Sequence, residues 1–86
     1  MSVYEIVFAR SARKDLQNLP SPVAELILGK IEALASNPRP RGCRKIRGSA
    51  NLWRLRTGEY RVVYEIDDRN RLIDVSVVRH RSEAYR

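Results

Sequence analysis

The segment LWRLRTGEYRVVY, residues 52–64, contains two runs of alternating apolar and basic residues joined at Gly58-Glu59. Two such runs separated by two residues, with glycine first, are typical of a β-hairpin closed by a type II′ turn. Because side chains alternate along a strand, one face of this hairpin is apolar and the other is cationic. The apolar face would carry Trp53, Leu55, Val62 and Tyr64, and the cationic face Arg54, Arg56 and Arg61.

The same register places Arg56 directly opposite Arg61. Like charges in direct opposition destabilise a strand pair, by some tenths of a kcal/mol up to about 1 kcal/mol. An anion bound between the two guanidinium groups would remove this conflict. The hairpin therefore predicts an anion site on its cationic face.

The composition agrees with an anionic partner. The chain has 86 residues, with 17 Lys+Arg against 10 Asp+Glu and a formal net charge of +7. Most of the cations are arginine, which suits bidentate contact with phosphate. Surplus charge can also be plain solvated surface, but the hairpin favours a polyanion. The length predicts one small domain, residues 1–86.

The numbers of cysteines and histidines and the hydropathy of the chain bear on its location and on whether it binds a membrane or a metal. Cys43 is the single cysteine and cannot form an internal disulfide, which predicts a reducing, cytoplasmic location. The sequence has no apolar signal segment and no run long enough to cross a membrane, so we expect no membrane partner. One cysteine and one histidine, His80, cannot build a structural zinc site, and we expect no metal and no cofactor.

The first half of the chain predicts a strand and two helices. Val3–Phe8 is short and rich in β-branched and aromatic residues, which is typical of a strand. Ser11 sits where a helix N-cap would, and apolar residues recur at helical spacing until Pro20 stops the run. Ser21-Pro22 begins a second and longer helix, with serine as the cap.

The second half predicts the sheet. Residues 36–42 contain two prolines and a glycine and should form a loop out of the second helix. Residues 43–48 are a candidate short edge strand, and residues 72–78 have the composition of an inner strand. The predicted fold class is α+β: an N-terminal strand, a two-helix hairpin, then an antiparallel sheet of three to four strands.

Two motifs stand out once these elements are in order. The hairpin carries Gly58-Glu59-Tyr60-Arg61, and the chain ends on HRSEAYR, residues 80–86. Together with the order of strand, helix pair, basic loop and sheet, they resemble the RelE/ParE toxin superfamily, and within it the RelE branch, over nearly the whole chain. The resemblance implies a RelE-like, microbial-RNase-like fold. It also implies the toxin of a toxin–antitoxin pair, a metal-independent endoribonuclease that cuts mRNA in the ribosomal A site and inhibits translation.

The resemblance assigns roles to residues of the hairpin and the tail. Arg61 matches the family's phosphate-stabilising arginine, and Arg79 or Arg81 matches the arginine that protonates the leaving group or stabilises transition-state charge. Tyr85 matches the tyrosine that stacks on the substrate base and helps to activate the 2′-hydroxyl. His80 is a secondary candidate for acid or base, and its alternative is a hydrogen-bonded residue at a strand end.

Basic residues near these candidate catalytic residues in the sequence are candidates for binding RNA phosphate. Arg54 and Arg56 fall where some relatives have lysines, and because a guanidinium stays charged, neither is a plausible general base. Lys45 and Arg47 belong to a basic loop that is either solvated or in contact with ribosomal RNA. Trp53 between these arginines could stack on a base, but its alternation with the apolar positions makes it core.

The implied partners are a RelB-like antitoxin, the ribosome and mRNA. Two alternatives remain on the same fold: a ParE-like toxin that inhibits gyrase without nuclease activity, and a non-catalytic RNA-binding module. The combination of Arg61, Tyr85, Arg54 and Arg56 favours the nuclease, because blocking gyrase by contact needs no such convergent set.

Overall fold

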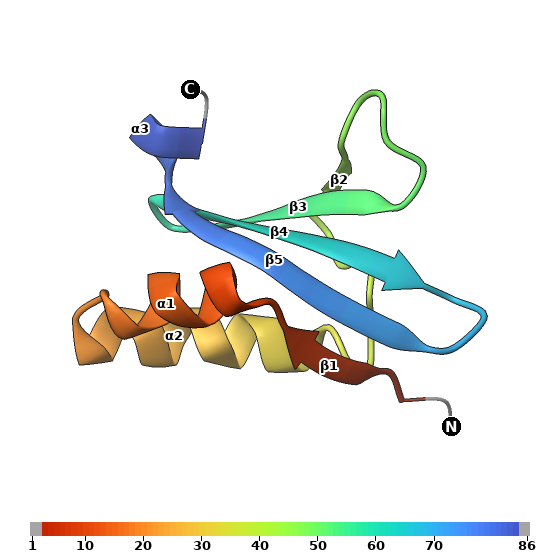
Figure 1. Ribbon diagram of the computed structural model, residues 1–86, viewed down its shortest axis with the longest axis horizontal. Helices are drawn as coiled ribbons and strands as arrows, with labels where there is room; N and C mark the ends of the chain where they lie inside the picture. The colour runs from red at the N-terminus through yellow and green to blue at the C-terminus, as the bar shows by residue number, and fades with distance from the viewer. Residues whose placement is uncertain (1–2, 85–86) are drawn as a thin grey trace.

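The computed structural model describes residues 3–84, arranged as one sheet with two helices packed against it (Figure 1). The elements in chain order are β1 (Glu5–Phe8), α1 (Arg10–Gln17), α2 (Ser21–Ala33), β2 (Arg44–Lys45), β3 (Leu52–Thr57), β4 (Tyr60–Asp67), β5 (Leu72–His80) and α3 (Arg81–Ala84). None of the helices in the described part of the chain has the length and apolar character needed to cross a membrane.

The sheet has five strands in the order β1-β5-β4-β3-β2. β1 runs parallel to β5, and the other neighbours are antiparallel. α1 and α2 lie together on one face, and α3 stands at the end of β5 away from them (Figure 1). The predicted α+β class and the inner position of residues 72–78 are confirmed. The edge strand predicted over residues 43–48 is confirmed only at Arg44–Lys45.

The hairpin has the predicted register. Thr57 pairs with Tyr60, and Arg56 pairs with Arg61. Gly58 has a φ of 58°, and Glu59 is not among the residues with positive φ, as a type II′ turn requires. Glycine adopts this φ without the steric cost of a Cβ atom. Gly58 therefore sets the pairing that brings the two arginines opposite each other.

β5 contains a one-residue bulge at Ser76. Val63 pairs with Val77 whereas Tyr64 pairs with Val75, so Ser76 is an extra residue in the ladder. The Ser76 carbonyl oxygen accepts a hydrogen bond from the Ser11 hydroxyl at 2.6 Å. Because of the bulge, Val75 and Val78 are both buried although they are three positions apart.

The helix starts differ from the prediction. Ser11 lies inside α1, whose N-cap is Ala9, and its hydroxyl bonds to the bulge instead of capping the helix. α2 begins at Ser21, with Pro20 in the cap position and no side-chain cap hydrogen bond. The predicted serine caps are therefore wrong. α1 starts directly after the turn that follows β1, and α2 starts directly after Pro20.

The core lies between the helix pair and the inner strands. Tyr64 is fully buried, and its hydroxyl donates a 2.8 Å hydrogen bond to the Pro38 carbonyl oxygen. Burial raises the pKa of this hydroxyl, which is therefore a neutral donor. Trp53 is half-buried and packs against the core, as predicted, and the Arg39 guanidinium lies 5.0 Å from its ring centroid.

Asp68 ties the loop after α2 to the turn between β4 and β5. Its carboxylate accepts hydrogen bonds from Arg39 at 2.8 Å and from the Tyr4 hydroxyl at 2.6 Å. These two donors lower the pKa of Asp68 to about 2. Arg39 and Asp68 are exposed, whereas the Tyr4 ring is half-buried and packs against the core, so the cluster joins the loop to the edge of the core.

Asp68→Asn is expected to reduce stability at mildly acidic pH but not at strongly acidic pH. A carboxyl whose pKa is depressed by folding stabilises the folded state above its ordinary pKa, and this stabilisation disappears as the pH falls toward the lower value. The difference in urea midpoint between the parent and Asp68→Asn should therefore shrink from about pH 5 to about pH 2. Glu25→Gln, at an exposed position on α2, is the matched control. A difference that stays constant over this range would contradict the assignment.

Candidate functional site

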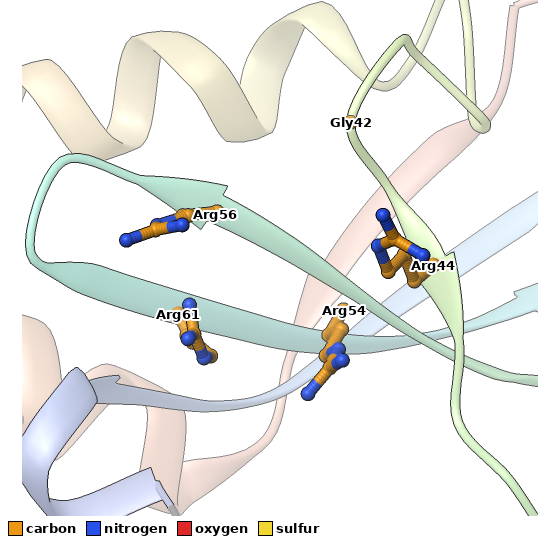
Figure 2. Close-up of a pocket in the computed structure, with 5 residues that line it drawn as sticks. All are labelled: Gly42, Arg44, Arg54, Arg56 and Arg61. Carbon is orange, nitrogen blue, oxygen red and sulfur yellow. The ribbon is translucent and has the colours of Figure 1, made fainter.

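Four arginines surround one hollow on the open face of the sheet. Figure 2 shows Arg44, Arg54, Arg56 and Arg61 around this cavity of about 190 Å³, with Gly42 as the fifth lining residue. We call it the arginine pocket. The lining contributes four cations and no carboxylate, so the site is built for an anion.

Strand alternation and register place these arginines. Arg54 and Arg56 come from β3 and Arg61 from β4, each on the face opposite the buried Leu55 and Val62. Arg44 joins them from β2, where it pairs with Arg54. Arg54 and Arg61 are half-buried, whereas Arg44 and Arg56 are exposed. A partly desolvated guanidinium interacts more strongly with an anion than a fully hydrated one.

Arg79 and Arg81, the two alternatives for the catalytic arginine, do not line this pocket. Arg79 pairs with Arg61 across the β4–β5 ladder, but its Nε lies 3.6 Å from the Asp15 carboxylate. Arg81 begins α3, and its Nε lies 3.5 Å from the Glu59 carboxylate. Each candidate therefore has its own carboxylate partner, one from α1 and one from the hairpin turn.

His80 lies on a second cavity, which we call the edge pocket. Its volume is about 240 Å³, and its lining residues are Asp15, Asn18, Leu19, Tyr60, Val78, Arg79 and His80. The His80 ring packs edge-to-face on Tyr60, with centroids 5.3 Å apart. Its Nδ1 lies 3.2 Å from the Ser82 amide nitrogen and 2.9 Å from the Ser82 hydroxyl oxygen. This is the hydrogen-bonded strand end that the sequence offered as the alternative to acid–base catalysis.

The remaining predicted residues are divided between a third surface and the chain end. Lys45 and Arg47 line another hollow beside Trp53, and Arg44 and Arg54 line both this hollow and the arginine pocket. Tyr85 lies outside the described residues. The structure thus groups Arg54, Arg56 and Arg61 in the arginine pocket, and Arg54 also lies in the hollow of Lys45 and Arg47.

Arg44 is the lining residue that the sequence did not single out. It was one of several cations in a basic loop, without a reason to prefer it. Arg44 reaches the pocket because it pairs with Arg54 in the sheet. The sequence could not reveal this pairing, because a two-residue strand is too short to show its register by alternation.

The pocket supports charge stabilisation better than metal chemistry. Within residues 3–84, no group of three or more His, Cys, Asp or Glu side chains is placed to hold a metal ion. Guanidinium groups stay protonated at all physiological pH and form paired hydrogen bonds with phosphate oxygens. A phosphate group, or the more highly charged transition state of a phosphoryl transfer, matches this chemistry.

The sequence of this chain is similar to those of known toxins. The model of the family described as the ParE toxin of type II toxin–antitoxin systems matches residues 6–85. Toxin RelE of Mycobacterium tuberculosis is 33% identical over 87 residues, covering 96% of this chain and 87% of that protein. Toxin RelG of the same organism is 33% identical over 84 residues, covering 96% of this chain and 97% of that protein.

Solved structures of RelE toxins have the same fold as this chain. The RelE–RelB complex of Pyrococcus horikoshii superposes with a TM-score of 0.83 at 27% identity, covering 94% of this chain and 98% of that one. The isolated RelE toxin of E. coli superposes with a TM-score of 0.79 at 29% identity, covering 95% and 90%. With its fold, its arginine pocket and these relatives, the chain belongs to the RelE/ParE family of toxins of type II toxin–antitoxin systems, on the RelE branch.

Proposed function

We propose that this toxin is a ribosome-dependent mRNA endonuclease that cuts by metal-independent attack of the 2′-hydroxyl. The observation that supports this best is the arginine pocket, where Arg54, Arg56 and Arg61 converge with Arg44 on one phosphate-sized hollow. A toxin that acted only by steric contact would not need four guanidinium groups facing one space.

The reaction needs an aligned nucleophile and stabilised charge. The 2′-oxygen forms a bond to phosphorus, the bond to the 5′-oxygen breaks, a base accepts the 2′-proton, and the 5′-oxygen takes up a proton. Arg61, Arg54 and Arg56 would hold the non-bridging oxygens, where negative charge increases in the transition state. We assign proton transfer to Tyr85 together with Arg79 or Arg81, as the family resemblance implies. The ribosome would supply the alignment that a small, open pocket does not.

The proposed partners follow from the charged surfaces and the relatives. Lys45 and Arg47 would contact ribosomal RNA through its phosphates, beside the arginine pocket. The neighbouring structures contain RelE bound to RelB, so we propose a RelB-like antitoxin as the neutralising partner. The proposed setting is the cytoplasm, where ribosomes and mRNA meet, with residues 1–86 acting as a single toxin domain.

The second candidate is a gyrase-inhibiting toxin. It is favoured by one observation, the match of residues 6–85 to a family described by its ParE toxins. The relatives named RelE and RelG, together with the arginine pocket, favour the nuclease. Assaying the purified chain for gyrase inhibition beside mRNA cleavage separates the two.

Cleavage is expected to leave a 2′,3′-cyclic phosphate or 3′-phosphate and a 5′-hydroxyl, because the nucleophile is the 2′-oxygen. The measurement is end-group analysis of mRNA cut on purified ribosomes, with cleavage positions mapped against the A site. An mRNA carrying a single 2′-deoxy nucleotide at the cleavage position should resist the toxin and serves as the matched control. Ends with 3′-hydroxyl and 5′-phosphate would refute the mechanism, and gyrase inhibition without cleavage would move the assignment to the second candidate.

A further inference from the structure

His80 occupies the N-cap position of α3. It is the last residue of β5, and α3 begins at the next residue, Arg81. The Ser82 backbone N–H is the second of the helix, and it donates to His80 Nδ1 across 3.2 Å. An N-cap side chain characteristically accepts a hydrogen bond from the second or third backbone N–H of its helix.

The cap is one of three contacts that place Arg81. The Arg81 backbone N–H donates to the Glu59 carbonyl oxygen at 2.7 Å, and its guanidinium Nε lies 3.5 Å from the Glu59 carboxylate. The His80 ring in turn packs on Tyr60, the first residue of β4. Arg81 is therefore fixed from the hairpin turn on one side and from the capped helix on the other.

We propose that His80 is a positioning residue whose neutral imidazole caps α3 and holds Arg81 beside the hairpin turn, and that protonation of His80 releases this cap. The link to cleavage rests on the proposed nuclease function, whereas the cap itself does not. His80 acts here through Arg81 and the helix rather than by transferring a proton to RNA.

The proton state of the ring decides whether it can cap. A neutral imidazole with its proton on Nε2 leaves Nδ1 free to accept from the Ser82 N–H, whereas an imidazolium carries donors on both nitrogens. The Ser82 hydroxyl, 2.9 Å away, can turn and accept from a protonated ring, but the backbone N–H cannot. Histidine side chains change charge between about pH 8 and pH 5. Lowering the pH through this range therefore tests whether protonation removes the cap.

Charged groups of both signs surround the ring. Asp15 of α1 and Arg79 of β5 share the edge pocket with it, and the Glu59–Arg81 pair lies at the start of α3. Tyr60 contributes its ring as the packing surface.

The first test measures the hydrogen bond that caps α3 in the absence of RNA. Ser82 amide protection, measured by NMR hydrogen exchange and corrected for intrinsic exchange, is expected to fall by about 5- to 10-fold between about pH 7.5 and pH 5.5. In His80→Asn, whose amide oxygen caps without titrating in this range, the protection should stay constant. In His80→Ala it should be low at both values. Constant protection in the parent would overturn the proposal.

The second test reads the consequence for cleavage. The ratio of the parent rate to the His80→Asn rate, measured on the same ribosomes, cancels the effect of pH on the ribosome itself. This ratio should be near one at about pH 7.5 and fall by about 5- to 10-fold by pH 5.5. A ratio that does not change with pH would overturn the positioning role.

A catalytic role gives a different pattern. If His80 transferred a proton to RNA, His80→Asn would lose cleavage at every pH, as would His80→Ala, and the positioning proposal would be wrong. If no variant cleaves mRNA, the nuclease function fails, and the Ser82 protection still decides whether His80 caps α3.

Discussion

Arg61→Ala is expected to lower mRNA cleavage on ribosomes by about 100- to 1,000-fold, the usual effect of removing one donor to transition-state charge. The chain should stay folded, because Arg61 lies on the open face of β4 while the neighbouring Val62 is fully buried. The effect should be large because Arg61 is half-buried in the arginine pocket and lies directly opposite Arg56. Single-turnover cleavage rates on programmed ribosomes give the measurement.

The matched control is Arg10→Ala, which removes the same charge from the exposed start of α1. It should cleave at close to the parent rate if the pocket, and not the net charge, carries the activity. Arg61→Lys separates charge from shape, since a lysine keeps the charge but loses the planar fork that binds two phosphate oxygens. Equal losses in Arg61→Ala and Arg10→Ala would show that the pocket assignment is wrong.

Tyr64→Ala is expected to destabilise the fold by about 3–5 kcal/mol, the range for truncating a large buried aromatic side chain. Tyr64 is 0% exposed, projects from β4 into the core, and donates a hydrogen bond from its hydroxyl to the Pro38 carbonyl oxygen. A loss of this size is a large share of the stability of a small domain. Urea denaturation followed by circular dichroism measures it.

Two further variants separate packing from hydrogen bonding. Tyr64→Phe keeps the ring and leaves the Pro38 carbonyl without its donor, which should cost about 1–3 kcal/mol. Trp53→Ala should cost less than Tyr64→Ala because Trp53 is only half-buried. If Trp53→Ala proved the more damaging of the two, the centre of the core would lie nearer the sheet edge than the structure places it.

The hairpin could be predicted from sequence because its information is local. Two residues at the turn and period-two alternation determine the register, and the register determines that Arg54, Arg56 and Arg61 share a face. The same reasoning applied to Trp53 and Tyr64 identified both as core residues. The predicted fold followed, since β1 and β5 have the composition of strands and a proline follows the end of each of the two long helices.

The rest of the site depends on pairings between distant segments. Arg44 enters the pocket through a two-residue strand, and the carboxylates beside Arg79 and Arg81 come from α1 and from the hairpin turn. No periodicity in the sequence connects Asp15 to Arg79, because the contact joins α1 to the far end of β5. The cap predicted at Ser11 failed for a related reason, since the Ser76 carbonyl oxygen, a tertiary acceptor, competed for the Ser11 hydroxyl.

The bulge at Ser76 makes the backbone conformation of one residue matter as much as the composition of β5. Strict alternation after Val75 would turn Val77 inward, and Arg79 with it, while Val78 and His80 would turn to the open face. The extra residue reverses that parity, so Arg79 is level with Arg61 and His80 meets Tyr60. Deleting Ser76 would join Val75 to Val77 in a regular ladder and leave Val78 and His80 on the side of the helices, whereas keeping Ser76 but flattening the bulge would turn them to the open face. Which side each of these residues faces therefore depends on the backbone conformation at one position and not on the side chain there.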